Sequence, residues 1–301
     1  MLLIATAVWG LSFALAKNLG NTFNSAGGLP AQHAFGQLAL TFVRFAIASI
    51  MWFAVLKWAR TNWTFDLARR GAVIGVLLAV GVMLQHAGLA HVSEATTAFL
   101  TSLSILFVAG VMWVFFHKRP TPALALAITM AIPGVWLMNG GVVARAWEPG
   151  SLLVLGSSFV FAWHLISINA LGTNRNPWKL AGAQFVCVAI GAGIATGVAW
   201  PAQFDWSVLA KLGVWTQFAL LIAGPTFFSF GVMTSYQPAV SPTRAALIYL
   251  LEPVFAAIFA WGINGAPITL WMLSGGVLIL TANAMVELWP KHAVRPGDGA
   301  A

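Results

Sequence analysis

The stretch VSEATTAFL at residues 92–100 returns, in altered form, as VSPTRAALI at residues 240–248. The offset is 148 residues (240 minus 92), and the same offset pairs Phe107 with Phe255. Self-similarity at a fixed period marks repeated structural units, so the chain is predicted to consist of two related halves. Other matching positions are Trp113 with Trp261, and AVW at residues 7–9 with FAW at residues 161–163.

The composition places both halves in a membrane. Apolar residues make up 60% of the chain, charged residues only 7%, and the mean hydropathy is +0.87. A globular domain carries about 25% charged residues, so a soluble protein is excluded. Because a helix needs about 20 apolar residues to cross a bilayer, we predict ten crossing segments. They cover approximately residues 2–19, 35–57, 70–91, 94–116, 122–140, 151–171, 178–200, 213–236, 243–263 and 268–289.

The placement of the basic residues predicts the orientation. Each half holds five segments, and because five is odd, the second half must enter the membrane from the opposite side. With a cytoplasmic amino terminus, eleven of the fifteen Lys and Arg residues fall on the cytoplasmic side, which is the positive-inside bias. Nucleic-acid binding would instead need the net charge of +8 on one face of a folded domain. The eleven residues are Lys57, Arg60, Arg69, Arg70, Lys118, Arg119, Arg175, Lys179, Arg244, Lys291 and Arg295.

These patterns predict an all-α integral membrane protein with ten transmembrane helices in two inverted five-helix repeats. The first repeat is expected over residues 1–144 and the second over residues 145–291, followed by a flexible cytoplasmic tail at residues 292–301. Ordered loops are expected at residues 20–34 and 200–212. The expected location is a bacterial inner (plasma) membrane, crossed many times, with both termini in the cytoplasm.

Several short motifs, in this order and spacing, resemble the drug/metabolite transporter superfamily, and specifically its EamA-type members with ten helices. The resemblance covers nearly the whole chain. It implies the movement of small metabolites such as amino acids or amphiphilic compounds, in many members outward, and it implies that the fifth and tenth spans lie away from the path. The motifs are Trp9-Gly10 with Lys17, Arg44-Phe45 with Ala46 and Ala48, residues 88–107, Arg119-Pro120-Thr121, residues 251–255 and Pro267-Ile268-Thr269.

The sequence departs from that family at two kinds of position. The family often places a Glu just before the proline that opens the fifth and tenth spans, where this chain has Lys118-Arg119 and Gly265-Ala266. The first copy also has Ser104-Ile105 where the second has Glu252-Pro253. The architecture does not depend on these residues, but a coupling mechanism or a substrate carried over from the family would.

Glu252 is the most informative single residue. It lies near the middle of a predicted span, where a charged side chain costs about 2.5–3.5 kcal/mol. Pro253 follows it and cannot donate to the carbonyl of Tyr249, which predicts a kink with a free acceptor beside the acid. Glu252 either titrates during transport or meets a substrate amine, or it is a structural acid that is protonated or paired with Arg44.

Polar and aromatic residues near the middle of the spans predict a cavity between the repeats. Thr97, Thr101 and Ser104 recur at helical spacing, and an offset of 148 residues relates Thr101 to Tyr249 and Ser104 to Glu252. Trp9 and Trp163 could form aromatic walls on two sides of a substrate. The expected substrate-binding residues are Trp9, Phe13, Gln85, His86, Thr97, Thr101, Ser104, Trp163, His164, Tyr249 and Glu252, from the first, third, fourth, sixth, eighth and ninth spans.

Three further residues have expected mechanical or electrostatic roles. Arg44 lies inside the second span, where it either pairs or reaches toward water with its head group, or binds a substrate carboxylate. Arg44 and Glu252 are therefore the candidates for charge pairing or coupling. Pro225 and Pro253 are the expected hinges for a cycle in which one repeat rocks against the other.

No motif for other chemistry is found in the sequence. There is no metal-ligand spacing, phosphate loop or nucleotide fingerprint, so neither a cofactor nor a metal is predicted. The lone Cys187 excludes a disulfide framework. Gly156-Ser157-Ser158 with His164 lacks the glycine that follows a nucleophilic serine in an elbow, so the chain is not expected to be an enzyme.

The sequence favours a secondary transporter, with export ahead of uptake, over a non-transporting membrane scaffold subunit. Its expected partners are a small-molecule substrate and the lipid bilayer, not nucleic acid. Protons are the candidate coupling ion, and a homodimer is the candidate assembly.

Overall fold

The computed structural model describes residues 1–92, 94–138, 149–264 and 267–288, and the regular elements in these ranges are all helical. Eight helical segments are long and apolar enough to cross a membrane, and two shorter apolar helices bring the number of predicted crossings to ten. The all-α membrane fold is thereby confirmed. The expected boundary at residues 144/145 and the expected tail at residues 292–301 lie outside the described residues.

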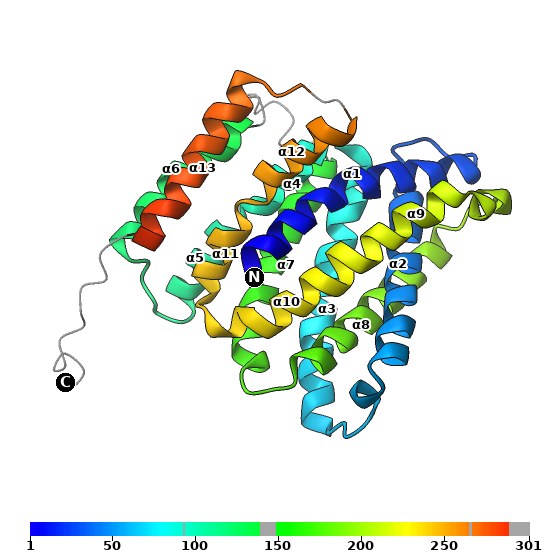
Figure 1. Ribbon diagram of the computed structural model, residues 1–301, viewed down its shortest axis with the longest axis horizontal. Helices are drawn as coiled ribbons and strands as arrows, with labels where there is room; N and C mark the ends of the chain where they lie inside the picture. Colours follow the sequence, from blue (N-terminus) through cyan, green and yellow to red (C-terminus); the bar gives the residue numbers. More distant parts are fainter. Residues whose placement is uncertain (93, 139–148, 265–266, 289–301) are drawn as a thin grey trace.

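The first half runs from α1 to α6 (Figure 1). A 3₁₀ turn at Lys57–Arg60 follows the second helix. The helices are α1 (Leu2–Ala26), α2 (Ala34–Val55), α3 (Phe65–His91), α4 (Glu94–Ser102), α5 (Ser104–Val114) and α6 (Pro122–Met138).

The second half runs from α7 to α13. Short 3₁₀ turns at Trp206–Ala210 (η2) and Gln237–Ala239 (η4) precede two of its helices, and a π-helical segment, η3 (Ile222–Phe228), joins α9 to α10. The helices are α7 (Pro149–Gly172), α8 (Pro177–Val198), α9 (Leu212–Leu221), α10 (Ser229–Tyr236), α11 (Pro242–Tyr249), α12 (Glu252–Asn264) and α13 (Leu270–Leu288).

Proline explains two interruptions in the spans of the second half. Pro225 has no backbone N–H for the helix, and the chain there adopts π-helical turns, in which Thr226 Oγ1 donates to the carbonyl of Leu221 at 2.9 Å. Pro253 follows a break between α11 and α12, as the missing donor to Tyr249 predicts. A third break, at Leu103 between α4 and α5, has no proline.

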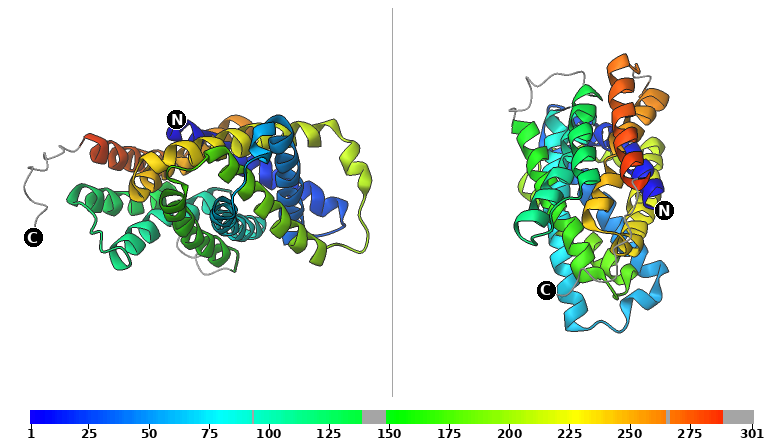
Figure 2. Two further views of the ribbon diagram at one scale, coloured as in Figure 1. Left: turned by 90° about the horizontal axis from the view of Figure 1, so that it is seen from below. Right: turned by 90° about the vertical axis from the view of Figure 1, so that its left-hand side faces the viewer.

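Helices of one half pack directly on helices of the other. α1 lies against α12, and α3 lies against both α7 and α8 (Figures 1 and 2). α6 and α13 pair with each other at one end of the molecule, beside the main bundle. The centre of the bundle is therefore built from both halves, which is the placement that a site between repeats requires.

The α1–α12 contact is close because Gly10 has no side chain. A Cβ atom at this position would lie 2.8 Å from the backbone nitrogen of Ala256 and 2.8 Å from Phe255 Cβ. Small residues allow helix backbones to approach in lipid, where van der Waals packing drives association.

We expect Gly10→Ala to lower the free energy of unfolding, because the added methyl group forces the two backbones apart at a cost of about 1–3 kcal/mol. The thermal unfolding temperature in detergent micelles measures this effect. Gly110→Ala is the matched control, because a Cβ atom there would have open space around it. Equal unfolding temperatures for the two variants would contradict the proposed tight contact.

The expected loop at residues 20–34 is shorter than the sequence suggests, because α1 continues to Ala26. The side chain of Asn24 explains the extension. Its Nδ2 donates to the carbonyls of Ala31 at 3.1 Å and His33 at 2.7 Å, and its Oδ1 accepts from the backbone N–H of Gly36 at 2.7 Å. An asparagine typical of loops therefore stays helical and holds the following turn.

Candidate functional site

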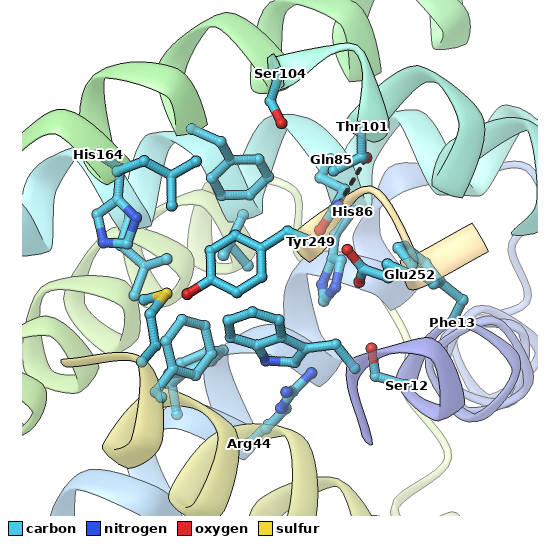
Figure 3. A pocket seen from close by; sticks show the side chains of 18 residues that line it. Ser12, Phe13, Arg44, Gln85, His86, Thr101, Ser104, His164, Tyr249 and Glu252 are labelled. Carbon is cyan, nitrogen blue, oxygen red and sulfur yellow. Dashed lines mark hydrogen bonds between the residues drawn. The ribbon is translucent and has the colours of Figure 1, made fainter. Parts of the chain in front are cut away.

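A cavity of about 110 Å³ lies in the middle of the bundle, between the two halves (Figure 3). A water molecule needs about 10–15 Å³ of such volume, so several waters fit. The first half contributes α1, α2, α3, α4 and α5, and the second contributes α7, α10, α11 and α12. The lining residues are Trp9, Ser12, Phe13, Arg44, Phe45, Leu78, Val82, Gln85, His86, Thr101, Ser104, Phe161, His164, Leu165, Phe230, Met233, Tyr249 and Glu252.

The cavity contains one basic and one acidic side chain that do not pair with each other. Arg44 is only 4% exposed, and its Nε donates to Thr226 Oγ1 at 2.7 Å. Its guanidinium carbon also lies 5.2 Å from the ring centre of Phe45. Glu252 forms no hydrogen bond or ion pair with the described residues, and Figure 3 shows its carboxyl group in the cavity near Ser12 and Tyr249. Both side chains therefore line the cavity without an ionic partner among the described residues.

Two hydrogen bonds through Thr41 on α2 hold His86 in one tautomer. Thr41 Oγ1 donates its single proton to the carbonyl of Gln37 at 2.7 Å, so it must accept from Nδ1 of His86. The neutral ring of His86 then keeps Nε2 as an acceptor.

His164 has a comparable partner on α8. Gln184 Nε2 donates to the carbonyl of Leu180 at 3.1 Å, so its Oε1 is the acceptor for His164 Nε2 at 2.8 Å. This leaves Nδ1 of His164 as the ring acceptor. The two histidines therefore add polarity to the cavity without a net charge.

The π-helical segment is bound by cavity residues from the first half. Trp9 Nε1 donates to the carbonyl of Pro225 at 3.0 Å, and the next residue, Thr226, accepts from Arg44. One turn further on, Ser229 Oγ donates to the carbonyl of Ala5 at 3.1 Å. The irregular backbone of the eighth span is therefore held by Trp9 and Arg44, two side chains that also line the cavity.

Aromatic rings form the apolar part of the lining. Trp9 meets Phe230 edge-on with ring centres 5.4 Å apart, and meets Tyr249 in the same way at 5.3 Å. The ring centres of Phe45 and Phe230 lie 6.1 Å apart, so Phe230 contacts both Trp9 and Phe45. Edge-to-face contacts of this kind stabilise a defined arrangement of rings.

The structure brings most of the predicted substrate-binding residues together. Nine line the cavity, and Gln85 Nε2 also donates to Thr101 Oγ1 at 2.9 Å. Trp163 and Thr97 do not line it: Trp163 lies edge-on to Phe115 with ring centres 5.6 Å apart, and Thr97 is fully buried one turn before Thr101. The nine residues are Trp9, Phe13, Gln85, His86, Thr101, Ser104, His164, Tyr249 and Glu252.

The second span also contributes to the cavity, although it was not among the spans that the sequence predicted to line it. Arg44 and Phe45 both reach the lining from α2. A cation inside an apolar span was the available signal, because such residues usually face a bundle interior or a wet cavity. The predicted pair of Arg44 with Glu252 is not formed; the Nε of Arg44 donates to Thr226 Oγ1 instead.

Both predicted hinge prolines accompany an irregularity of the backbone. Pro225 lies inside η3, and Pro253 lies in the first turn of α12, directly after the break that follows α11. The described residues contain no group of three or more His, Cys, Asp or Glu side chains that could hold a metal ion.

Comparison with known proteins gives consistent matches. The model of the EamA-like transporter family matches residues 1–140 and again residues 148–288. A protein of Archaeoglobus fulgidus described as an uncharacterized transporter is 24% identical over 292 residues, which cover 95% of this chain and 84% of that protein. A solved structure titled "Crystal structure of protein" has a TM-score of 0.64 and 17% identity, and the match covers 96% of this chain and 98% of that one. The last match bears on the fold alone.

Proposed function

Because the chain belongs to the EamA-like transporter family, we propose that it is a secondary transporter that exports small organic metabolites by alternating access. The observation that carries this proposal is the central cavity, which both halves enclose and which holds Arg44 and Glu252 apart from each other. Uptake through the same path is the alternative direction. The proposed location is a bacterial inner membrane with both termini in the cytoplasm, and a homodimer stays a prediction.

The lining supports substrates that combine an apolar body with charged ends, such as amino acids or amphiphilic compounds. Arg44 offers a cation to a carboxylate, and Glu252 offers an anion to an amine. The rings of Trp9, Phe230 and Tyr249 offer apolar surface between them. Burying two charged groups is costly, so a pure scaffold would gain nothing from keeping them here.

The irregular helices support a rocking or bending motion. The π-helical segment around Pro225 and the break before Pro253 both adjoin the cavity, and discontinuous helices near the midplane are typical of transporter sites. In this proposal, a substrate that binds Arg44 competes with Thr226 for the guanidinium. The hydrogen bond that anchors η3 to Arg44 is thereby weakened.

Proteoliposomes that contain the purified protein test this function. A panel of radiolabelled amino acids and amphiphilic cations should include compounds that cross faster than in protein-free liposomes, and an imposed proton gradient should change the rate if protons are coupled. Saturable transport of at least one compound supports the proposal. Rates equal to protein-free liposomes for the whole panel, in both gradient directions, would favour the scaffold alternative.

A further inference from the structure

A second and larger cavity opens at one end of the bundle. This cleft of about 940 Å³ lies between α5, the segment that joins α5 to α6, the start of α6, α7 and the start of α11. Its basic residues are Lys118 and Arg119, which are exposed, and Arg244, which is half-buried. No Asp or Glu lies among its lining residues in the described part of the chain. The cleft is therefore positively charged.

The backbone adds to this positive character. Both α6 and α11 begin at the cleft, with Thr121 Oγ1 accepting from the backbone N–H of Leu124 at 3.3 Å and Ser241 Oγ accepting from that of Arg244 at 3.3 Å. The amino-terminal end of a helix carries a partial positive charge. Two such ends and three cationic side chains thus surround one open space.

A hydrogen-bonded bridge links a residue of the central cavity to a residue of the cleft. Tyr249, which lines the central cavity, donates through its hydroxyl to Gln237 Oε1 at 3.1 Å. Gln237 is fully buried, and its Nε2 donates to Asn169 Oδ1 at 2.9 Å and to the carbonyl of Leu165 at 2.8 Å. Asn169 lines the cleft. The Tyr249–Gln237–Asn169 bridge therefore has one end in each space.

We propose that the cleft is a vestibule that binds the carboxylate or other anionic group of the transported molecule, and that the Tyr249–Gln237–Asn169 bridge is the barrier it crosses to reach the central cavity. The charge bias of the sequence assigns this end to the cytoplasm. The inference rests on the proposed transport function and adds a substrate class to it. A basic concave surface raises the local concentration of anions, which suits the capture of a substrate before transport.

Thiol modification tests the vestibule without the need for a known substrate. In a Cys187→Ser background, which removes the single native cysteine, Ala170→Cys places a thiol on the cleft lining. We expect a negatively charged methanethiosulfonate reagent to react with this thiol faster than a positively charged one of similar size, relative to a free thiol in solution. The expected preference is about tenfold or more, as for other electrostatically focused sites.

Charge removal provides the decisive comparison. The double variant Lys118→Gln with Arg119→Gln should abolish the preference, whereas Lys57→Gln with Arg60→Gln, a basic pair outside the cleft, should leave it unchanged. An equal preference in both double variants would overturn the vestibule. Loss of the preference at Ala170→Cys in vesicles rich in anionic phospholipid, measured relative to Thr173→Cys, an exposed position nearby that does not line the cleft, would assign the cleft to lipid head groups and would also overturn the vestibule.

A second thiol tests the barrier. Ser104→Cys places the thiol in the central cavity, and we expect Tyr249→Phe or Gln237→Ala to raise its modification rate from the cleft side severalfold while the rate at Ala170→Cys stays the same. Tyr249→Phe deletes a single hydroxyl, so it tests the same hydrogen bond even if Gln237→Ala does not fold. Unchanged rates at Ser104→Cys in both variants would contradict the barrier. If transport is observed but these accessibility results are not obtained, the vestibule is contradicted and the proposed transport function is not.

Discussion

Glu252→Gln is expected to lower the transport of amine-bearing substrates about 10- to 100-fold, because a hydrogen bond to a charged group contributes about 1.5–3 kcal/mol. The variant should also make the remaining transport insensitive to an imposed proton gradient. Glu252 makes no hydrogen bond or ion pair with the described residues and faces Arg44, His86, His164 and Tyr249 across the cavity, so its carboxyl group is available to a proton or to a substrate. Initial rates in proteoliposomes between pH 5.5 and about 8 measure both effects.

Glu94→Gln is the matched control for this prediction. Glu94 is the first residue of α4 and does not line the central cavity, so its substitution should leave rate and proton dependence close to those of the parent chain. Normal transport by Glu252→Gln, with an intact proton dependence, would assign Glu252 a purely structural role.

Arg44→Gln is expected to weaken the recognition of carboxylate-bearing substrates, with a rise in KM of about 10- to 100-fold for the loss of a charged hydrogen bond. It also removes the donor to Thr226, so two control variants separate the effects. Thr226→Val keeps the cation and removes the acceptor that competes with the substrate, so it should not raise KM. Arg44→Lys keeps the charge but lacks the planar guanidinium group, so its KM should lie between those of Thr226→Val and Arg44→Gln.

The measurement is the KM for one transported compound and for its carboxamide analogue. The parent chain should distinguish the two compounds, and Arg44→Gln should not. The substrate-binding role of Arg44 would be contradicted if Thr226→Val raised KM as much as Arg44→Gln, because the cation would then act only through the π-helical segment.

The fold could be predicted largely from the sequence because two strong signals agree. Low charge and long apolar segments indicate spans, and the recurrence of residues 92–100 at 240–248 indicates two halves. The helix ends were less predictable where side chains act locally. Asn24 normally favours a loop, but here its amide satisfies three backbone groups of the next turn, so α1 runs on to Ala26.

The site was predictable to the extent that residues share a helical face. Phe161 lines the cavity together with His164 and Leu165, which follow it by three and four residues. Trp163 follows Phe161 by two residues and so lies about 200° around the helix from it, on the side away from the cavity, because a helix has 3.6 residues per turn. Similarity to Trp9 could not reveal this rotation. The offset there is 154 residues (163 minus 9) instead of 148, so the two repeated stretches do not share one register along the sequence.

The role of the second span was missed for a different reason. An arginine inside a helix can pair, reach for water or bind a ligand, and periodicity does not separate these outcomes. The decisive partner, Thr226, is 182 residues away in the chain and lies in a π-helical turn. Only the folded bundle brings the two together.

Substrate protection of a thiol in the cavity between the halves tests whether transported molecules occupy that cavity. Ser12→Cys in the Cys187→Ser background places a small thiol on the α1 side of the lining. We expect an impermeant reagent to modify this thiol from either side of the membrane, and we expect transported compounds, unlike non-transported analogues, to slow the reaction. A thiol that reacts from one side only, or at a rate that no transported compound changes, would contradict occupation of the cavity by transported molecules.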